Sequence, residues 1–326
     1  MTAPKRIDTE LLHELPLPVV LGETDKNSRG RVLVVGGSRR VPGAVALSGL
    51  SALRVGAGKI QLAVPSSISS ALGLAVLESG LCPLQESGDG EPTAAPTEEL
   101  IRAAKQSDAI LIGPGILSEE CADDLVECLL REVVGPVYVI DALALCGLWN
   151  DAELLRVHGG RIVLTPHAGE MAQLAGVDKS AVDADPIGVA REAAARLSSV
   201  LVLKGSTTFI VTPSGLGYSH TDGVVGLATA GSGDVLAGIV AGLSSRGAAP
   251  AVAAIWAVYL HGRAGNKLSQ SMGRLGFIAS DLPGTLPGLL EEAEIAIRAR
   301  ASRTEPATSS VAGSTHQRTA DPVSSA

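Results

Sequence analysis

The sequence is poor in aromatic side chains and in positive charge, and each shortage excludes a class of protein. Phe, Trp and Tyr make up 2% of the 326 residues while 46% are hydrophobic, so Ala, Val, Leu and Ile must build the core. Small aliphatic side chains favour helices packed closely on a parallel sheet. Lys and Arg number 26 against 34 Asp and Glu, a formal net charge of −8. This balance argues against binding to nucleic acid or to an anionic membrane surface.

The sequence also has few cysteines and lacks the features of a signal peptide. No C-x-x-C pair or histidine cluster accompanies the four cysteines, which are Cys82, Cys121, Cys128 and Cys146. We therefore expect buried free thiols and no zinc site. The N-terminus lacks the apolar segment of a signal peptide, so we expect a reducing, cytoplasmic location.

One run, residues 224–243, is apolar enough and long enough to cross a bilayer. Asp234 stands in its middle, and Gly231 and Gly233 would break a helix where lipid tolerates no loose backbone. We therefore exclude a membrane span at this position.

Short apolar segments alternate with helical patterns along most of the chain. Strands are predicted at 31–35, 59–64, 108–112, 137–140, 161–164 and 200–203, with a hairpin of 209–212 and 216–220. Helices are predicted at 44–55, 97–104, 118–132, 170–176, 185–197, 232–246, 250–267 and 286–300. Such alternation is typical of an α/β fold with a mostly parallel sheet. We expect one domain at 30–300, an N-terminal arm at 1–29 and a disordered tail at 301–326.

Almost every predicted strand ends in a glycine turn or a polar residue. The carboxyl ends of parallel strands share one edge of the sheet, and ligands bind at that edge in open α/β folds. Six segments are therefore expected to converge on one site: 36–44, 113–115, Asp141, 165–170, 204–208 and 231–234.

The segment 231–234 is the most informative of the six. Gly231, Ser232 and Gly233 lead directly into Asp234 and an apolar helix. A glycine turn at a helix N-terminus offers free N–H groups and the positive end of the helix dipole, so these three residues predict an anion hole. Asp234 is then a candidate base, although an Asp in this position also suits ordinary helix capping. Its pKa is open at this stage, because a helix N-terminus lowers it and burial raises it.

Three other segments carry candidate binding groups. Residues 204–208, Lys-Gly-Ser-Thr-Thr, offer an ammonium and hydroxyls to a nucleotide, or form a plain turn at the sheet edge. His167 can bind a substrate phosphate or hydroxyl, or cap the next helix, and Glu170 can cap that helix too. Asp141 can bind a hydroxyl or a hydrated cation, or be an ordinary strand end. These dispersed acids lack metal-ligand spacing, so no protein-held metal site is predicted.

Several segments, taken in order, resemble a known family. Residues 229–238, Thr-Ala-Gly-Ser-Gly-Asp-Val-Leu-Ala-Gly, are similar to the anion-hole motif of ribokinase-like enzymes. The chain from about residue 8 to 300 resembles the ADP-dependent NAD(P)H-hydrate dehydratases in four further segments: 52–58, 112–115, 165–170 and 203–208. The combination of Thr-Pro-His-Ala-Gly-Glu with Ala-Leu-Arg-Val-Gly-Ala-Gly is the most specific part of this resemblance.

The resemblance implies a fold, a reaction and a set of site residues. The fold would be a ribokinase-like three-layer α/β/α sandwich. The reaction would convert (6S)-NADHX and (6S)-NADPHX to NADH and NADPH, with ADP giving AMP and phosphate. The hydrate would contact Ala44, Gly115, His167 and Asp234, with Asp234 as the catalytic base. The nucleotide would contact Lys204, Gly205, Ser206, Thr207, Thr208 and Gly233. The resemblance also implies Mg²⁺, ADP or ATP as co-substrate, and a homo-oligomer, often a homotetramer.

The chain departs from the family pattern in two places. Leu143 stands where the family usually has the second acid of the Asp-Ala-Asp-Ala-Leu run that begins here at Asp141. Many members carry an amino-terminal epimerase domain, whereas this chain starts almost directly at the kinase-like part, so we expect no epimerase activity. Two other functions remain open: a ribokinase-like kinase of a small alcohol or vitamin precursor, and a non-catalytic nucleotide sensor. Asp234 and Lys204 argue against the sensor.

Overall fold

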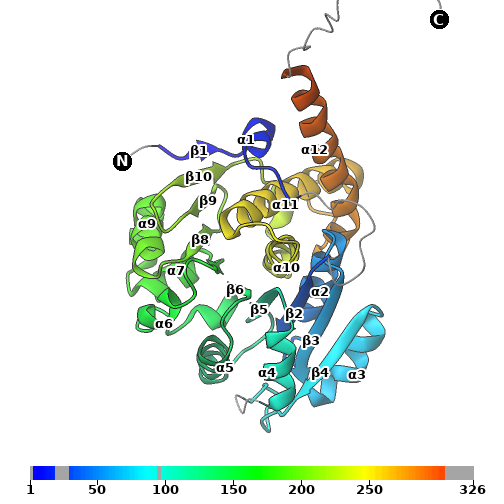
Figure 1. Cartoon of the computed structure of the whole chain (residues 1–326), viewed down its shortest axis with the longest axis vertical. Coiled ribbons are helices and arrows are strands. Elements are labelled where there is room, and N and C mark those ends of the chain that lie inside the picture. Colours follow the sequence, from blue (N-terminus) through cyan, green and yellow to red (C-terminus); the bar gives the residue numbers. More distant parts are fainter. Residues whose placement is uncertain (1–2, 19–28, 94–96, 305–326) are drawn as a thin grey trace, which may run out of the picture.

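A ten-stranded sheet is the central element of the computed structural model, which describes residues 3–18, 29–93 and 97–304 (Figure 1). The strand order is β1-β10-β9-β8-β7-β6-β5-β2-β3-β4. The bounds are β1 Lys5–Arg6, β2 Arg31–Val35, β3 Lys59–Pro65, β4 Ser79–Leu84, β5 Ala109–Ile112, β6 Val137–Ile140, β7 Ile162–Leu164, β8 Val200–Leu203, β9 Thr208–Val211 and β10 Gly217–His220. Only β9 runs antiparallel to its neighbours, β8 and β10. The mostly parallel sheet and the hairpin are confirmed.

Helices cover both faces of this sheet and make the molecule three-layered (Figure 1). One layer holds α1 Thr9–Glu14, α2 Gly43–Arg54, α3 Ser66–Ala75, α10 Ser232–Ser245, α11 Pro250–Met272 and α12 Leu282–Thr304. The other holds α4 Glu98–Lys105, α5 Glu119–Glu132, α6 Ala152–Arg156, α7 Ala168–Ala175, α8 Lys179–Ala184 and α9 Pro186–Arg196. Along β2, Val34 packs into the first core and Leu33 and Val35 into the second, as the alternation of a strand requires.

Glycine lets α2 and α10 approach each other closely. A Cβ on Gly238 would lie 2.2 Å from the carbonyl oxygen of Ser48, and one on Gly242 would lie 2.6 Å from Cγ2 of Val55. The Ser48 hydroxyl donates to the carbonyl oxygen of Asp234 at 3.0 Å and links the two helices. This contact holds the first turn of α10 against the middle of α2.

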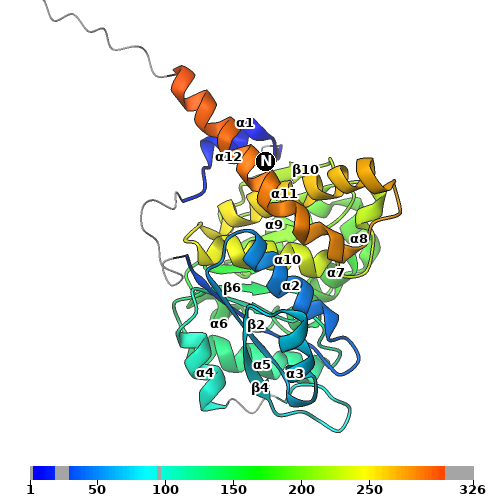
Figure 2. The same cartoon turned by 90° about the vertical axis from the view of Figure 1, so that its right-hand side faces the viewer.

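The segment predicted as an N-terminal arm is joined to the sheet. β1 pairs in parallel with β10, and Ile7, directly after it, is 1% exposed. The Trp256 indole in α11 donates to the carbonyl oxygen of Leu15 at 2.8 Å. α1 packs against α12 (Figure 2). Residues 3–18 therefore contribute to the core of the domain.

Some elements differ from the sequence prediction. α3 and β4 were not predicted, because α3 is rich in Ser and β4 contains Pro83, which only an edge strand tolerates. α11 runs to Met272 instead of 267, and α12 begins at Leu282 instead of 286. α12 continues to Thr304, and the remainder of the predicted tail, 305–326, lies outside the described residues.

Two expectations from composition can be compared with the structure. No helix in the described ranges is long and apolar enough to cross a membrane, and α10 begins only at Ser232, as the glycines predicted.

The four cysteines are free thiols, but only Cys82 is buried. The expectation of buried thiols is wrong for the other three, which are half-buried: Cys121, Cys128 and Cys146. In α5 the core positions are taken by larger aliphatic side chains such as Leu125 and Leu129.

Candidate active site

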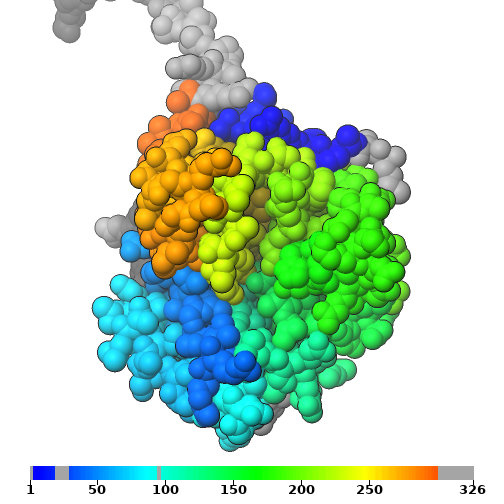
Figure 3. Space-filling model, turned by 180° about the vertical axis from the view of Figure 1, so that it is seen from behind, coloured from blue at the N-terminus to red at the C-terminus, as the bar shows by residue number. Residues whose placement is uncertain are grey.

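The predicted site segments do meet at one edge of the sheet. β2, β5, β6, β7 and β8 are parallel, so the loops after them leave on the same side. Figure 3 shows parts of the chain that are far apart in sequence, coloured blue, green and yellow, meeting on one face. The N–H of Gly37 donates to the carbonyl oxygen of Pro114 at 2.7 Å, which joins the loops after β2 and β5. The Cβ of Ala44 lies 3.2 Å from where a Cβ on Gly115 would stand, so two predicted substrate contacts are neighbours.

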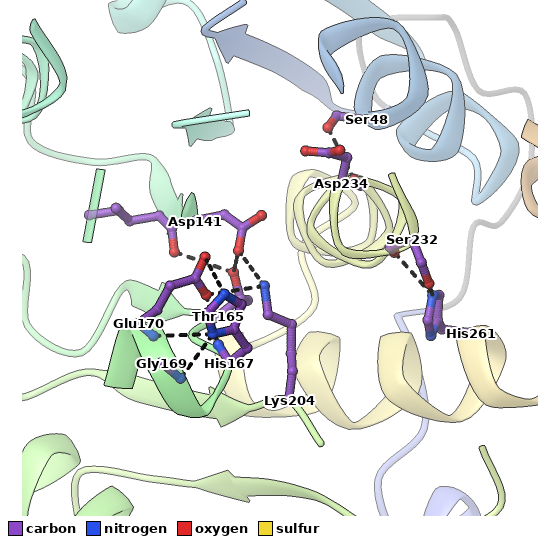
Figure 4. Close-up of polar contacts among 11 residues, drawn as sticks. Ser48, Asp141, Thr165, His167, Gly169, Glu170, Lys204, Ser232, Asp234 and His261 are labelled. Carbon is purple, nitrogen blue, oxygen red and sulfur yellow. Dashed lines mark hydrogen bonds and ion pairs between the residues drawn. The ribbon is translucent and has the colours of Figure 1, made fainter. Parts of the chain in front are cut away.

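A half-buried lysine connects three of the loops. Lys204, directly after β8, donates from Nζ to Oδ1 of Asp141 at 2.8 Å and lies 3.6 Å from Oε2 of Glu170 (Figure 4). The Lys204 side chain is 19% exposed and that of Asp141 is 4% exposed. Burial alone would lower the pKa of Lys204, but the carboxylates of Asp141, Glu170 and Asp234 outweigh it and raise that pKa. The ammonium therefore stays charged and is available to an anionic ligand.

His167 caps α7 through one ring nitrogen and turns the other toward Glu170 and the solvent. Its Nδ1 accepts from the backbone N–H groups of Gly169 and Glu170 at 3.0 and 3.1 Å, and the Glu170 carboxylate accepts from the His167 N–H at 2.7 Å. Because Nδ1 accepts two hydrogen bonds, the proton of the neutral imidazole sits on Nε2. Nε2 lies 3.5 Å from Oε1 of Glu170, and because the His167 side chain is 58% exposed, Nε2–H can also reach a ligand. The capping interpretation and the binding interpretation of His167 are compatible.

The turn before α10 has the predicted form. Gly231 has φ +88°, and a Cβ there would lie 2.6 Å from Leu47, so only glycine fits. Within the described residues, the N–H groups of Gly231, Gly233 and Asp234 have no backbone or side-chain acceptor. One detail differs from the predicted anion hole: the Ser232 N–H donates to the carbonyl oxygen of Thr229 at 3.2 Å and is not free. The reversal of the chain at Gly231 turns that N–H back toward the preceding loop.

Asp234 occupies the third position of α10, beside Lys204. Its Oδ2 lies 4.0 Å from where a Cβ on Gly231 would stand, and the Lys204 Nζ lies 3.4 Å from the corresponding point on Gly233. Burial raises the pKa of Asp234 to about 7, with Asp141 and Glu170 adding to the rise and Lys204 opposing it. Burial is the largest of these causes and places the pKa of Asp234 well above the ordinary 3.8 of an aspartate. A carboxyl group with this pKa can take up a proton near neutral pH.

The loop after β8 presents the remaining predicted nucleotide contacts. Gly205 and Ser206 are exposed beside Lys204, and Thr207 is half-buried. Thr208 is already the first residue of β9, one residue earlier than the predicted hairpin strand, and its hydroxyl donates to the carbonyl oxygen of Gly205 at 3.4 Å. This open loop can surround a phosphate or ribose that also reaches the ammonium of Lys204.

His261 in α11 was not predicted. Its Nε2 lies 3.0 Å from Oγ and 3.1 Å from the carbonyl oxygen of Ser232, on the side of α10 away from Lys204 (Figure 4). A carbonyl can only accept, so Nε2 carries the proton. Burial lowers the pKa of His261 to about 4, and the ring stays neutral. A single histidine inside an apolar helical segment was the available signal, but nothing in the sequence indicated its partner.

The acids of the site do not form a metal cage. Among the described residues, no group of three or more His, Cys, Asp or Glu side chains could hold a metal ion. Leu143, in the 3₁₀ turn Ala142–Leu145, is half-buried against the second core and supplies no oxygen ligand. A divalent cation at this site would therefore depend on oxygens of a bound nucleotide.

The sheet and its two helical layers have the ribokinase-like α/β/α fold. The structure superimposes on a ribokinase-like superfamily protein from Enterococcus faecalis with a TM-score of 0.73, at 24% identity, over 89% of this chain and 96% of the other. The NAD(P)H-hydrate dehydratase family model matches residues 32–287. The chain belongs to the NAD(P)H-hydrate dehydratase family.

Individual relatives agree with this membership. An ADP-dependent (S)-NAD(P)H-hydrate dehydratase of Xanthomonas campestris pv. campestris is 44% identical over 294 residues, 89% of this chain and 98% of the relative. The chain spans about half of a bifunctional NAD(P)H-hydrate repair enzyme of Moorella thermoacetica, at 39% identity. The ADP/ATP-dependent NAD(P)H-hydrate dehydratase of Bacillus subtilis, co-crystallised with ATP and Mg²⁺, has a TM-score of 0.72 at 26% identity, over 90% of this chain and 99% of the other.

Proposed function

We propose that this chain is an ADP-dependent NAD(P)H-hydrate dehydratase, a hydro-lyase that restores NADH and NADPH from (6S)-NADHX and (6S)-NADPHX. ADP is consumed and AMP and phosphate are released. The activity named for the Xanthomonas relative, which this chain matches over nearly its whole length, supports the reaction. The observation in this chain that carries the proposal is Asp234, a half-buried carboxyl group with a pKa of about 7 beside free N–H groups and a charged lysine.

The residues suggest how the reaction proceeds. The hydroxyl of the hydrate is a poor leaving group, and its phosphorylation makes it a good one. Asp234 accepts the hydroxyl proton as the oxygen bonds to the β-phosphorus of ADP and the bond to AMP breaks. The N–H groups of the α10 turn and the Lys204 ammonium stabilise the charge on the moving phosphoryl group. The ring nitrogen then expels phosphate, and loss of a ring proton restores the reduced nicotinamide.

The binding roles follow the geometry of the edge. Ala44 and Gly115 form one wall for the hydrate, and His167 offers Nε2–H from the loop after β7. We assign the nucleotide to the loop after β8 and the start of α10, that is, to Lys204, Gly205, Ser206, Thr207, Thr208 and Gly233. The proximity of Nζ of Lys204 to Gly233 supports placing the phosphates between these two segments.

Mg²⁺ is expected to arrive with the nucleotide. Magnesium keeps several waters and is usually held by one or two carboxylates together with phosphate oxygens. Since no group of three or more acids and histidines among the described residues could hold the ion, phosphate oxygens and water would supply most of its ligands, and it would neutralise phosphate charge there. A homo-oligomeric assembly and a cytoplasmic location stay predictions.

The test is to incubate the purified chain with NADHX and, in separate reactions, ADP, ATP or no nucleotide. We expect the absorbance of the reduced nicotinamide to return with ADP and not without nucleotide. No return with either nucleotide would overturn the proposal. Phosphorylation of a small alcohol in place of the hydrate would favour the kinase alternative.

A further inference from the structure

We propose that Asp141 is a positioning residue of this site, whose buried carboxylate holds the Lys204 ammonium under the first turn of α10 and so determines the charge that surrounds Asp234. The inference rests on the proposed function for the reaction it serves. The first evidence is how firmly the fold holds Asp141 itself.

The backbone around Asp141 is tightly constrained. A Cβ on Gly113 would lie 1.9 Å from the Asp141 carbonyl oxygen, so a glycine with φ +118° is needed for the loops after β5 and β6 to meet. Ala142, the next residue, has φ +54°, a left-handed conformation that a residue with a Cβ adopts at a cost. Strained backbone persists where surrounding contacts impose it, and it clusters at functional sites. Here it presents the Asp141 side chain at the end of β6.

The carboxylate is held as firmly as the backbone. The Thr165 hydroxyl donates to Oδ1 of Asp141 at 2.7 Å, and Lys204 donates to the same oxygen at 2.8 Å. Thr165 is 1% exposed and its own backbone N–H pairs with Ile140 in the sheet, so it gives the carboxylate a rigid support. A charge-assisted bond to a fixed partner removes the rotamer freedom that a lysine otherwise has.

The position of Lys204 depends mainly on this bond. The second carboxylate in ion-pair contact with Lys204, Glu170, is farther away at 3.6 Å, and its Oε2 already accepts from the His167 N–H. Nζ lies 3.4 Å from where a Cβ on Gly233 would stand, which places the ammonium against the turn assigned to phosphate. Without the Asp141 carboxylate, the Lys204 ammonium loses its shortest hydrogen bond and its strongest electrostatic partner.

Three charged groups face Asp234: Asp141 after β6, Glu170 on α7 and Lys204 after β8. The two carboxylates hold its pKa up and the ammonium pulls it down. Replacing Asp141 with Asn removes one negative charge and leaves Lys204 less neutralised. The pKa of Asp234 is then expected to fall, which moves the acid limb of the rate profile to lower pH and weakens the base.

The test compares Asp141→Asn with Asp124→Asn, which makes the same charge change on the exposed surface of α5. For Asp141→Asn we expect kcat/KM at neutral pH to fall by about tenfold or more, the cost of a misplaced binding group. The KM for ADP should rise and the acid limb of the kcat profile should move to lower pH. Asp124→Asn should match the wild type. An unchanged KM for ADP together with an unmoved limb in Asp141→Asn would overturn the proposal.

Thr165→Val keeps the charge and removes only the support, so it tests the idea if Asp141→Asn fails to fold. We expect a higher KM for ADP with an unmoved acid limb, and wild-type values for both would contradict the positioning role. Calorimetric titration with ADP separates this inference from the proposed function. A wild type that binds ADP without restoring NADH refutes the function, while weaker ADP binding by Asp141→Asn still supports the positioning role.

Discussion

At the scale of single residues, the site is defined by which groups carry a proton at neutral pH. Lys204 keeps its proton because three carboxylates surround it, and His261 stays neutral because it is buried. Asp234 lies between these extremes, with a pKa of about 7. One charged donor, one titrating acid and a set of free N–H groups are the components that phosphoryl transfer to a hydroxyl requires.

Asp234→Asn should abolish most of the activity. General-base catalysis contributes about 10²–10⁴-fold, so we expect kcat to fall by roughly that factor while ADP still binds. In the wild type, kcat should rise with pH through about 7 as Asp234 loses its proton. The pH profile of kcat checks both statements. Turnover of the variant at the wild-type rate would show that another group is the base.

The same substitution should stabilise the protein at neutral and alkaline pH. The pKa of Asp234 is raised from 3.8 to about 7 in the folded state, so the folded protein binds this proton more tightly than the unfolded chain does. The stability that the protonated acid contributes is complete below 3.8 and is lost as pH rises through about 7. Asn carries no charge, so Asp234→Asn should raise the melting temperature at pH 8 and change it little at pH 4. An equal shift at both pH values would contradict this account.

His261→Ala should loosen the first turn of α10, which His261 contacts through Ser232. The substitution removes both contacts of Nε2 with Ser232, leaves the first turn of α10 less fixed, and should lower kcat/KM several-fold. His261→Gln keeps a donor and should recover part of the loss. Kinetics of the two variants at one pH check this, and equal losses would mean that the hydrogen bond is not what matters.

At this scale the sequence identified candidate titratable groups but not their contacts. Asp234 and Lys204 were identified because their residue types and their places after a glycine turn and a strand are informative. His261 was missed because its partner, Ser232, lies 29 residues earlier and is brought near only by the packing of α10 on α11. The bond of the Ser232 N–H to Thr229 was also missed, since it depends on the φ of Gly231.

At the scale of elements, the site depends on how closely α10 lies against α2. Gly238→Ala would place a methyl group 2.2 Å from the Ser48 carbonyl oxygen, so the helices must separate. We expect a loss of stability of about 1–3 kcal/mol, typical of overpacking, and lower activity because the turn at Gly231 moves with the helix. Chemical denaturation and kinetics check the two effects.

Gly288→Ala is the matched control within α12. A Cβ there meets nothing within 4 Å, so only the helix propensity changes and stability should rise by up to about 1 kcal/mol. If both substitutions have the same effect on stability, close approach is not the reason for glycine at 238.

Strands buried on both faces were the elements most readily predicted. β2, β6 and β8 have the bounds that their apolar runs indicated, because a short Val- and Ile-rich segment between turns has few alternatives. β1 was not predicted, since two polar residues form a strand only by pairing with β10 more than 200 positions away. Edge elements depend on such distant partners, which local patterns do not reveal.

At the scale of the whole molecule, three histidines whose pKa values are lowered make stability sensitive to acid. Burial lowers the pKa of His158 and His220 below their ordinary 6.5, and lowers that of His261 to about 4. The folded state binds these protons more weakly than the unfolded chain does. The stabilisation from the neutral histidines is therefore complete above pH 6.5 and is lost as the pH falls from there toward 4. We expect the free energy of unfolding to drop over this interval.

His220→Gln tests this dependence one site at a time. Urea denaturation at pH 7.5 and pH 5 should show a smaller loss of stability on acidification in the variant than in the wild type. The ring of His220 packs 6.3 Å from that of Tyr259, so some overall stability is expected to be lost as well. A pH dependence identical to that of the wild type would show that this histidine is not responsible.

The convergence of the site was predictable at this scale from one rule. Parallel strands send their ends to the same edge, so turns after β2, β5, β6, β7 and β8 had to meet. The rule places segments but not atoms, and the bonds of Asp141 to Thr165 and Lys204 appeared only in the structure.

The most direct test of the central claim is the stoichiometry of the reaction with NADHX and ADP. Phosphorus NMR and nicotinamide absorbance, followed together, should show one AMP and one phosphate formed for each NADH restored, with no such change in Asp234→Asn. NADH that returns without consumption of ADP, or ADP that is consumed without return of NADH, would contradict the account.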